Sequence, residues 1–169
     1  QLGNHLCLLV RLDQPYLVDV GFGGSLGGPL PLRVGERYDD PYQVALSVIA
    51  DDYWRFSEVA SDHDPFSFDF HAVPADEALF ARKCHALQSE PTSTFVQNLV
   101  VQRRAGTAHL SLRGRVLATI RSAGTHKVLL TSADELVKTL RETFDLDVPE
   151  AAGLWPTICA RHQALFGAG

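Results

Sequence analysis

Residues 16–24, with the sequence YLVDVGFGG, constrain the fold and the chemistry of this chain more than any other segment. They place one carboxylate, that of Asp19, at the end of an apolar run and directly before a glycine-rich turn. A carboxylate in apolar surroundings is costly unless it is paired or hydrogen-bonded. Glycines let the turn bend freely and leave its backbone N–H groups open to a ligand. The segment therefore predicts a strand that ends in a loop where Asp19 has a specific partner.

His5 is the candidate partner, because it lies fourteen residues upstream on what reads as the other strand of a hairpin. A buried aspartate that orients a histidine is half of a nucleophile-activating device. With the turn centred on Gln14, both side chains share one face, but His5 is opposite Gly23 and too far from Asp19 for a hydrogen bond. A bend or bulge near Gly21 would close that distance. The alternative, which spacing alone favours, is a turn-capping aspartate and an ordinary histidine.

The composition is that of a soluble globular protein, with 46% hydrophobic and 21% charged residues in a chain of 169. The balance of 15 Lys and Arg against 20 Asp and Glu gives a net charge of −5, which argues against nucleic acid as a partner. No apolar stretch reaches transmembrane length, so no membrane partner is expected. The first residues also lack the charged start and apolar run of a secretory signal.

The cysteines and histidines show no metal-binding pattern. Three cysteines (Cys7, Cys84 and Cys159) form no C-x-x-C pair, and the seven histidines show no H-x-x-x-H or H-E-x-x-H spacing. No disulfide framework and no metal are expected, and a reducing, cytoplasmic setting is the simplest interpretation. Methionine is absent throughout, including at position 1. We therefore expect a fragment or a processed C-terminal part.

Short strand-forming runs separated by turn residues fill the first half of the chain. Residues 6–12 and 16–20 predict a hairpin, and Pro15 fits its turn because proline cannot lie in a central strand. Residues 21–28 contain five glycines in eight and predict a loop. Several short strands at this spacing favour a small antiparallel barrel. Its other strands are expected at residues 29–32, 42–49, 53–58 and 66–70.

The second half begins with good helix formers at residues 74–89, which predict a connecting helix. Ser132 and Glu135 have the spacing of a capping box, and apolar residues follow at helical intervals, so residues 132–144 predict an amphipathic helix. A final helix is expected near residues 150–165, kinked or restarted by Pro156. Four strands between these helices are expected at residues 95–103, 109–112, 116–121 and 127–130.

The order of these elements indicates a mainly β fold with some α-helix. An antiparallel β-barrel over residues 1–72 carries His5 and Asp19, and a linking helix covers residues 73–90. An α/β lid with a C-terminal helical tail covers residues 91–169.

Several ordered motifs carry a resemblance to a known family. A strand that opens with His5 is followed by a VDVGFG box and a P-x-x-L element, at residues 18–23 and 29–32. The sequences SEPTSTF at residues 89–95 and LRGR at residues 112–115 come next. In this order and spacing the chain resembles the central region of arylamine N-acetyltransferases. The resemblance runs from His5 to about residue 148, and the ordered set is more specific than any one motif.

The resemblance implies a fold related to papain-like cysteine proteinases and a Cys-His-Asp triad. The cysteine would take an acetyl group from acetyl-CoA and pass it to an arylamine or arylhydrazine, in a ping-pong reaction of xenobiotic metabolism. It assigns His5 as the base and Asp19 as the residue that orients it. The family's nucleophile lies in an R-G-G-x-C motif of an N-terminal helical domain, and this sequence lacks that motif. Cys7 is a poor substitute, and Cys84 and Cys159 fall in predicted helices far from the VDVGFG box, where they are expected to be structural. The chain alone is therefore expected to be inactive.

Further site residues come from the resemblance alone. Phe22 falls where the family places an aromatic residue at the acceptor pocket; an exposed loop phenylalanine is the alternative. The positions expected to contact the coenzyme are Gly23, Gly24, Ser25, Thr92, Phe95 and His126. For Phe95 an ordinary core position, and for His126 an ordinary turn histidine, are the alternatives.

Two functions remain open. The chain either supplies the barrel and lid of an acetyltransferase, together with a missing N-terminal domain as its partner, or is a non-catalytic module that binds CoA or an aromatic ligand. The oligomeric state is not predicted.

Overall fold

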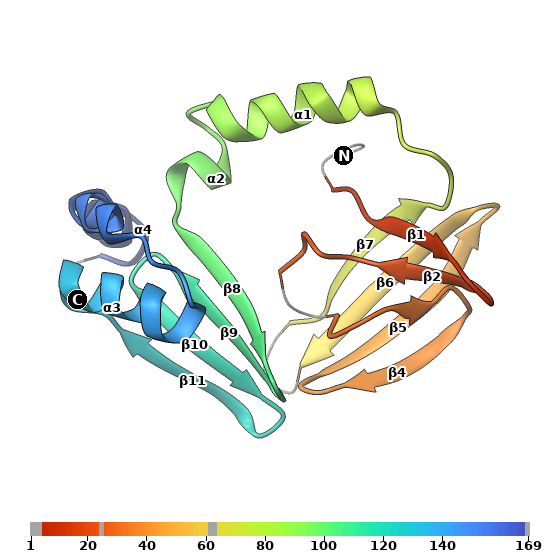
Figure 1. Ribbon diagram of the computed structural model, residues 1–169, viewed down its shortest axis with the longest axis horizontal. Coiled ribbons are helices and arrows are strands. Elements are labelled where there is room, and N and C mark those ends of the chain that lie inside the picture. The colour runs from red at the N-terminus through yellow and green to blue at the C-terminus, as the bar shows by residue number, and fades with distance from the viewer. Residues whose placement is uncertain (1–4, 24–25, 61–63, 168–169) are drawn as a thin grey trace.

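The computed structural model describes residues 5–23, 26–60 and 64–167. Two β-rich parts stand side by side, and helix α1 (Glu77–Ser89) bridges them at one end (Figure 1). Among the described residues, the helices are all too short or too polar to cross a membrane.

The first β-rich part consists of two antiparallel sheets. One has the order β1-β2-β3, with β1 at Leu8–Arg11, β2 at Pro15–Val18 and β3 at Leu30–Pro31. The other is a meander of four strands: β4 (Gly35–Asp39), β5 (Tyr42–Ala50), β6 (Tyr53–Ala60) and β7 (Phe66–His71). Their inner faces share one apolar core, in which Leu17, Val44 and Phe56 are at most 1% exposed. This core fixes β2, and therefore the residue that follows it, Asp19.

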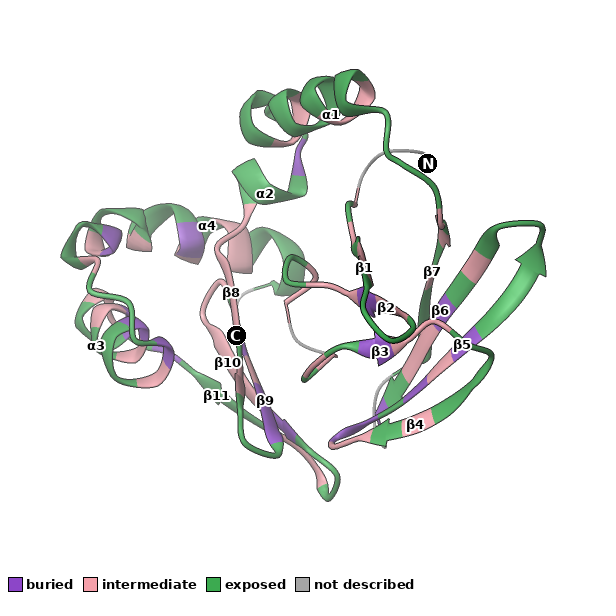
Figure 2. Cartoon of the chain, turned by 45° about the vertical axis from the view of Figure 1, so that its right-hand side comes forward, coloured by how far each residue is buried: buried purple, intermediate pink, exposed green. Residues whose placement is uncertain are grey.

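Helix α1 carries the chain to the second part. Asp76 caps its start by accepting a hydrogen bond from the N–H of Leu79 at 2.9 Å. None of the 13 residues of α1, all of which are described, is buried, and Figure 2 shows this helix mostly exposed, with intermediate burial on part of it. A short helix, α2 (Thr94–Gln97), follows after a turn.

The second β-rich part is a meander covered by helices on one face (Figure 1). Its strands lie in the order β11-β10-β9-β8. Leu136, Leu140 and Phe144 line the buried side of α3 and pack against Leu112 of β9. The elements of this part are β8 (Val100–Ala105), β9 (Ala108–Arg113), β10 (Val116–Arg121), β11 (Gly124–Leu129), α3 (Ala133–Phe144), the 3₁₀ helix η1 (Pro149–Leu154) and α4 (Trp155–Phe166).

The expected mainly β, antiparallel class is confirmed, and so is a capped helix after Ser132, whose hydroxyl accepts from the N–H of Glu135 at 3.1 Å. The last helix restarts at Trp155, with Pro156 in its first turn. Closure of the barrel, and the division into units of 1–72, 73–90 and 91–169, stay predictions.

Three expectations about the elements are wrong. Strand β4 was not expected, because its sequence GERYD lacks an apolar run. Phe95 lies in helix α2 and not in a strand, because the Ser93 hydroxyl caps that helix. The connecting helix starts at Glu77 and not at Pro74, because Asp76 supplies the cap.

Candidate active site

His5 and Asp19 form a hydrogen-bonded pair at the edge of the first sheet. The Nε2 atom of His5 lies 2.5 Å from Oδ2 of Asp19. The side chain of Asp19 is 2% exposed, whereas that of His5 is 26% exposed. The other carboxylate oxygen, Oδ1, accepts the backbone N–H groups of Gly21 and Phe22, each at 3.0 Å. The loop therefore occupies one oxygen of Asp19 and leaves the second for the histidine.

The hairpin register explains why the two side chains meet. Leu8 pairs with Val18, so the turn lies one residue earlier than the turn centred on Gln14 that the sequence predicts. Continuing this register places His5 opposite Gly21, and a methyl group added there would lie 3.8 Å from Cε1 of the imidazole. Asp19 is then a diagonal neighbour of His5, within reach of its side chain. The predicted register was wrong by two residues. The bend expected near Gly21 is present at residues 20–22, directly after β2 ends at Val18.

The environment of Asp19 favours its charged form. Burial raises the pKa of this carboxyl, but the hydrogen bond and charge of His5, with the N–H groups of Gly21 and Phe22, outweigh burial and hold the pKa below its usual value. A carboxylate at this position accepts the Nε2–H of the imidazole, so Nδ1 is left as the nitrogen that can accept a proton. The pair has the geometry of a base held in one tautomer by a buried carboxylate.

Aromatic rings surround the imidazole. The rings of Phe22 and Phe68 each meet the His5 ring edge to face, with centroids 5.5 Å apart. Phe66 stacks on Phe22 at a centroid distance of 4.9 Å. These apolar walls limit the orientations open to His5 and give the site a surface suited to a flat ring.

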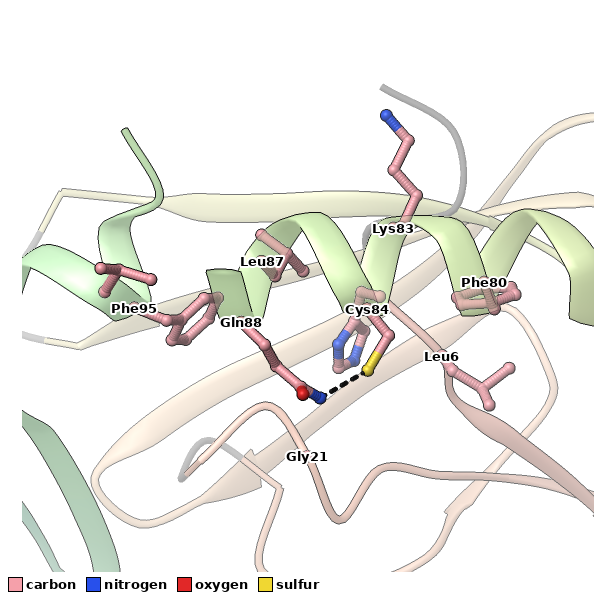
Figure 3. A pocket seen from close by; sticks show the side chains of 10 residues that line it. Leu6, Gly21, Phe80, Lys83, Cys84, Leu87, Gln88 and Phe95 are labelled. Atoms are coloured by element: carbon pink, nitrogen blue, oxygen red, sulfur yellow. Dashed lines mark hydrogen bonds between the residues drawn. The ribbon is translucent and has the colours of Figure 1, made fainter. Parts of the chain in front are cut away.

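His5 also lines a pocket of about 760 Å³. Helix α1 forms one wall, and Figure 3 shows Phe80, Cys84 and Leu87 on its turns above Gly21. Most of the side chains that line the pocket are apolar, and a few are polar. This composition is typical of sites that bind small molecules. The full lining comprises His5, Leu6, Gly21, Phe80, Lys83, Cys84, Leu87, Gln88, Phe95 and Val96.

Two thiols lie near this site. Cys84, expected from sequence to be structural and far from the VDVGFG box, is exposed and lines the pocket with His5, because α1 folds back over the N-terminal strand. Its Sγ accepts a hydrogen bond from Nε2 of Gln88 at 2.9 Å. Burial and the nearby charge of Asp19 raise the pKa of the Cys7 thiol to about 11. Cys7 therefore stays protonated at neutral pH and packs as an apolar residue.

The other predicted site residues are only partly brought together. Phe95 lines the pocket with His5, and Phe22 contacts the imidazole directly. Thr92 is exposed in the turn before α2, and His126 is exposed on β11, where it pairs with Thr119; neither lines the pocket. Gly23 lies against Gln102 of β8. Gly24 and Ser25 lie outside the described residues.

Sequence reasoning missed several residues at the site. The alternation of Phe66, Phe68 and Phe70 places these rings on one face of β7 and was a usable signal for the aromatic wall. Cys84 and Gln88 gave no such signal, because only the tertiary path of α1 brings them to His5. Within residues 5–23, 26–60 and 64–167, no group of three or more metal-ligating side chains is placed to hold a metal ion.

Comparisons with known proteins agree on one family. A family model described as N-acetyltransferase matches residues 1–152. An arylamine N-acetyltransferase of Mycolicibacterium smegmatis is 31% identical over 145 residues, which cover 83% of this chain and 52% of that protein. The chain thus spans about half the length of the curated relatives it matches.

Solved structures show the same similarity. The Mycobacterium marinum arylamine N-acetyltransferase in complex with CoA superposes with a TM-score of 0.79 at 30% identity, over 94% of this chain and 59% of that one. The arylamine N-acetyltransferase of M. tuberculosis gives a TM-score of 0.77 at 28% identity, over 92% of this chain and 60% of that one. The fold described above is therefore the fold of one part of these enzymes.

Proposed function

The chain belongs to the arylamine N-acetyltransferase family, and from this membership we propose that it supplies the histidine and the aspartate for acetyl transfer from acetyl-CoA to an arylamine or arylhydrazine. The observation that carries the proposal is the hydrogen bond between His5 and the buried Asp19, at the edge of a pocket.

The proposed reaction has two steps, in each of which His5 moves one proton. Nδ1 of His5 takes the proton of a cysteine thiol, and the thiolate attacks the acetyl carbon of acetyl-CoA. The bond to the coenzyme sulfur breaks, and His5 returns its proton to that sulfur. The acceptor amine then attacks the acetyl-cysteine, loses its proton to His5 and expels the thiolate. Asp19 stabilises the imidazolium formed each time.

The family motif that carries the nucleophilic cysteine, R-G-G-x-C, is the component that this sequence does not show. Cys7 is unsuited to the task, since its pKa is raised to about 11. The proposal therefore concerns a protein in which a separate cysteine reaches Nδ1 of His5 from the pocket side.

We assign the coenzyme and the acceptor to the surfaces that flank His5. The solved M. marinum relative is a complex with CoA, which supports a coenzyme site on this fold. Phe95 is the predicted coenzyme residue that the pocket supports best, because it lines the same cavity as His5. Phe22, in contact with the imidazole, is placed to receive a flat acceptor ring. The coenzyme roles of Gly23, Gly24, Ser25, Thr92 and His126 stay predictions.

The experiment uses the protein expressed from the complete reading frame that encodes this chain. Acetylation of an arylamine by acetyl-CoA should occur, and His5→Ala should lower kcat/KM by about 10³-fold or more, as expected for loss of a base that activates a nucleophile. His85→Ala removes an exposed imidazole from α1 and is the matched control, which should keep full activity. Normal turnover by His5→Ala would refute the assignment.

A non-catalytic binding module is the second candidate, because the pocket beside His5 offers a binding surface whether or not a thiol reaches the imidazole. It predicts that the protein from the complete reading frame binds CoA or an arylamine without releasing acetylated product. Calorimetric titration with CoA, run beside the turnover assay, separates the two functions. Binding without turnover supports the module, and turnover that depends on His5 supports the enzyme.

A further inference from the structure

Strand β8 of the second β-rich part lies directly against the loop that follows Asp19. A methyl group added to Gly23 would lie 2.6 Å from Nε2 and 3.0 Å from Cδ of Gln102. The Gln102 side chain therefore occupies the space in which any other residue would carry its Cβ. Gly23 also has a φ of +95°, a backbone conformation that other residues adopt at a cost. The backbone conformation thus favours glycine where the loop meets β8, and the end of the Gln102 side chain fills the space beside it.

A second contact ties the same strand to the other end of the loop. Arg104 lies two residues after Gln102 and so on the same face of β8. Its Nη2 is 3.3 Å from Oδ1 of Asp39 and donates to the carbonyl of Asp40 at 2.5 Å. Oδ2 of Asp39 in turn accepts the N–H of Gly27 at 3.0 Å. One face of β8 therefore contacts the loop at Gly23 and, through Asp39, near Gly27.

The loop that β8 contacts is also the loop that holds Asp19. The N–H groups of Gly21 and Phe22 donate to Oδ1 of Asp19, and Phe22 is bonded directly to Gly23. The Phe22 ring meets the imidazole of His5 edge to face. A displacement of Gly23 therefore acts on both the carboxylate and the histidine within two residues. Small misplacements of this kind have large effects on catalytic geometry.

We propose that Gln102 is a positioning residue, which holds Gly23 so that the N–H groups of Gly21 and Phe22 stay on Asp19. Arg104 supports the same loop at its far end. In this arrangement the second β-rich part sets the orientation of the His5–Asp19 pair, and Gln102 acts on that pair through Gly23. The contact between Gln102 and Gly23 does not depend on what the protein does. Only its consequence for turnover rests on the proposed function.

The first test is amide hydrogen exchange on this chain with Gln102→Ala. The amides of Gly21 and Phe22 should exchange about fivefold faster, as expected when a loop loses local stability of the size of one hydrogen bond. Amides of β5 and β6 should be unchanged. Gln43→Ala is the control, because Gln43 is an exposed residue of β5 whose side-chain amide donates to Glu36. Unchanged exchange at Gly21 and Phe22, or equal acceleration throughout, would overturn the proposal.

A double-mutant cycle tests the contact itself. Gly23→Ala should perturb the Phe22 and His5 NMR signals more strongly when Gln102 is present than in the Gln102→Ala background, because the shorter side chain makes room for the methyl group. Additive perturbations would refute the contact.

The enzyme assay then separates this proposal from the proposed function. In the protein from the complete reading frame, Gln102→Ala should lower kcat for several acceptors by a common factor and leave their KM values unchanged. If His5→Ala proves fully active while the exchange result holds, the proposed function fails and the positioning contact stands. If His5 is essential but Gln102→Ala has wild-type exchange and kcat, the positioning role is refuted.

Discussion

Asp19→Asn should reverse the tautomer of His5, and the geometry of the pair shows why. Oδ1 of Asp19 accepts two backbone N–H groups at 3.0 Å, and Oδ2 faces Nε2 of His5 at 2.5 Å. Asparagine has one oxygen and one NH₂ group. If the oxygen keeps the two N–H groups of the loop, the NH₂ group faces Nε2, which must then lose its hydrogen. The proton moves to Nδ1, the nitrogen needed as the base.

The size of the effect follows from the bonds that change. The loop bonds to Gly21 and Phe22 survive, whereas the charge-assisted bond to the imidazole becomes a neutral one. A charge-assisted bond contributes about 1.5–3 kcal/mol and a neutral one about 1 kcal/mol, so the free energy of unfolding should fall by about 0.5–2 kcal/mol. Where turnover occurs, the wrong tautomer should lower kcat by about 10⁴-fold. Stability and turnover therefore respond on very different scales.

The assay is ¹⁵N NMR of the histidine side chains, combined with urea unfolding. In the unsubstituted chain Nε2 of His5 should be protonated, and in Asp19→Asn it should be the unprotonated nitrogen. Asp13→Asn is the control, because the Asp13 carboxylate is exposed on the same hairpin and accepts from the Tyr16 hydroxyl. An imidazole that keeps Nε2–H in Asp19→Asn would refute the reasoning.

Three further results are expected. N-Ethylmaleimide at neutral pH should label the exposed Cys84 well before Cys7, whose pKa is raised to about 11, as peptide mass spectrometry would show; faster labelling of Cys7 would contradict the packing described. The stability that Asp19 contributes should be present above the ordinary carboxyl pKa and disappear as the pH falls through its lowered folded-state value, so wild type and Asp19→Asn should converge in urea midpoint on acidification. A difference in urea midpoint between the two proteins that stays constant as the pH falls would contradict this linkage. Ser132→Ala removes the cap of α3 and should lower the free energy of unfolding by about 1 kcal/mol, whereas the exposed Ser89→Ala should have little effect; equal effects would count against the cap.

The sequence predicted best those elements that are stabilised by residues near one another in the chain. Strand β10 (Val116–Arg121) has the predicted bounds, and the Ser132 hydroxyl caps α3 as the S-x-x-E spacing indicates. Strand β4 escaped detection because a half-exposed strand of sequence GERYD needs no apolar run. Helix α2 was missed because its stability depends on the Ser93 cap more than on periodicity.

The site was predictable in its residues and not in its geometry. The apolar run before Asp19 and the glycines after it identify a carboxylate that needs a partner. The contact between Asp19 and His5 depends on the register of the hairpin, which the turn sets. When the centre of the turn shifts by one residue, each residue's partner on the opposite strand shifts by two. Cys84 and Gln102 reach the site through the tertiary paths of α1 and β8, which leave no mark in the local sequence.

The central claim is that the His5–Asp19 pair activates a thiol toward acetyl-CoA. The most direct test is the single-turnover rate of CoA release from acetyl-CoA, before any amine is added, using the protein from the complete reading frame. We expect a rapid release of one equivalent of CoA in the wild type and a rate lower by about 10⁴-fold in Asp19→Asn. Equal rates in the two proteins would contradict it.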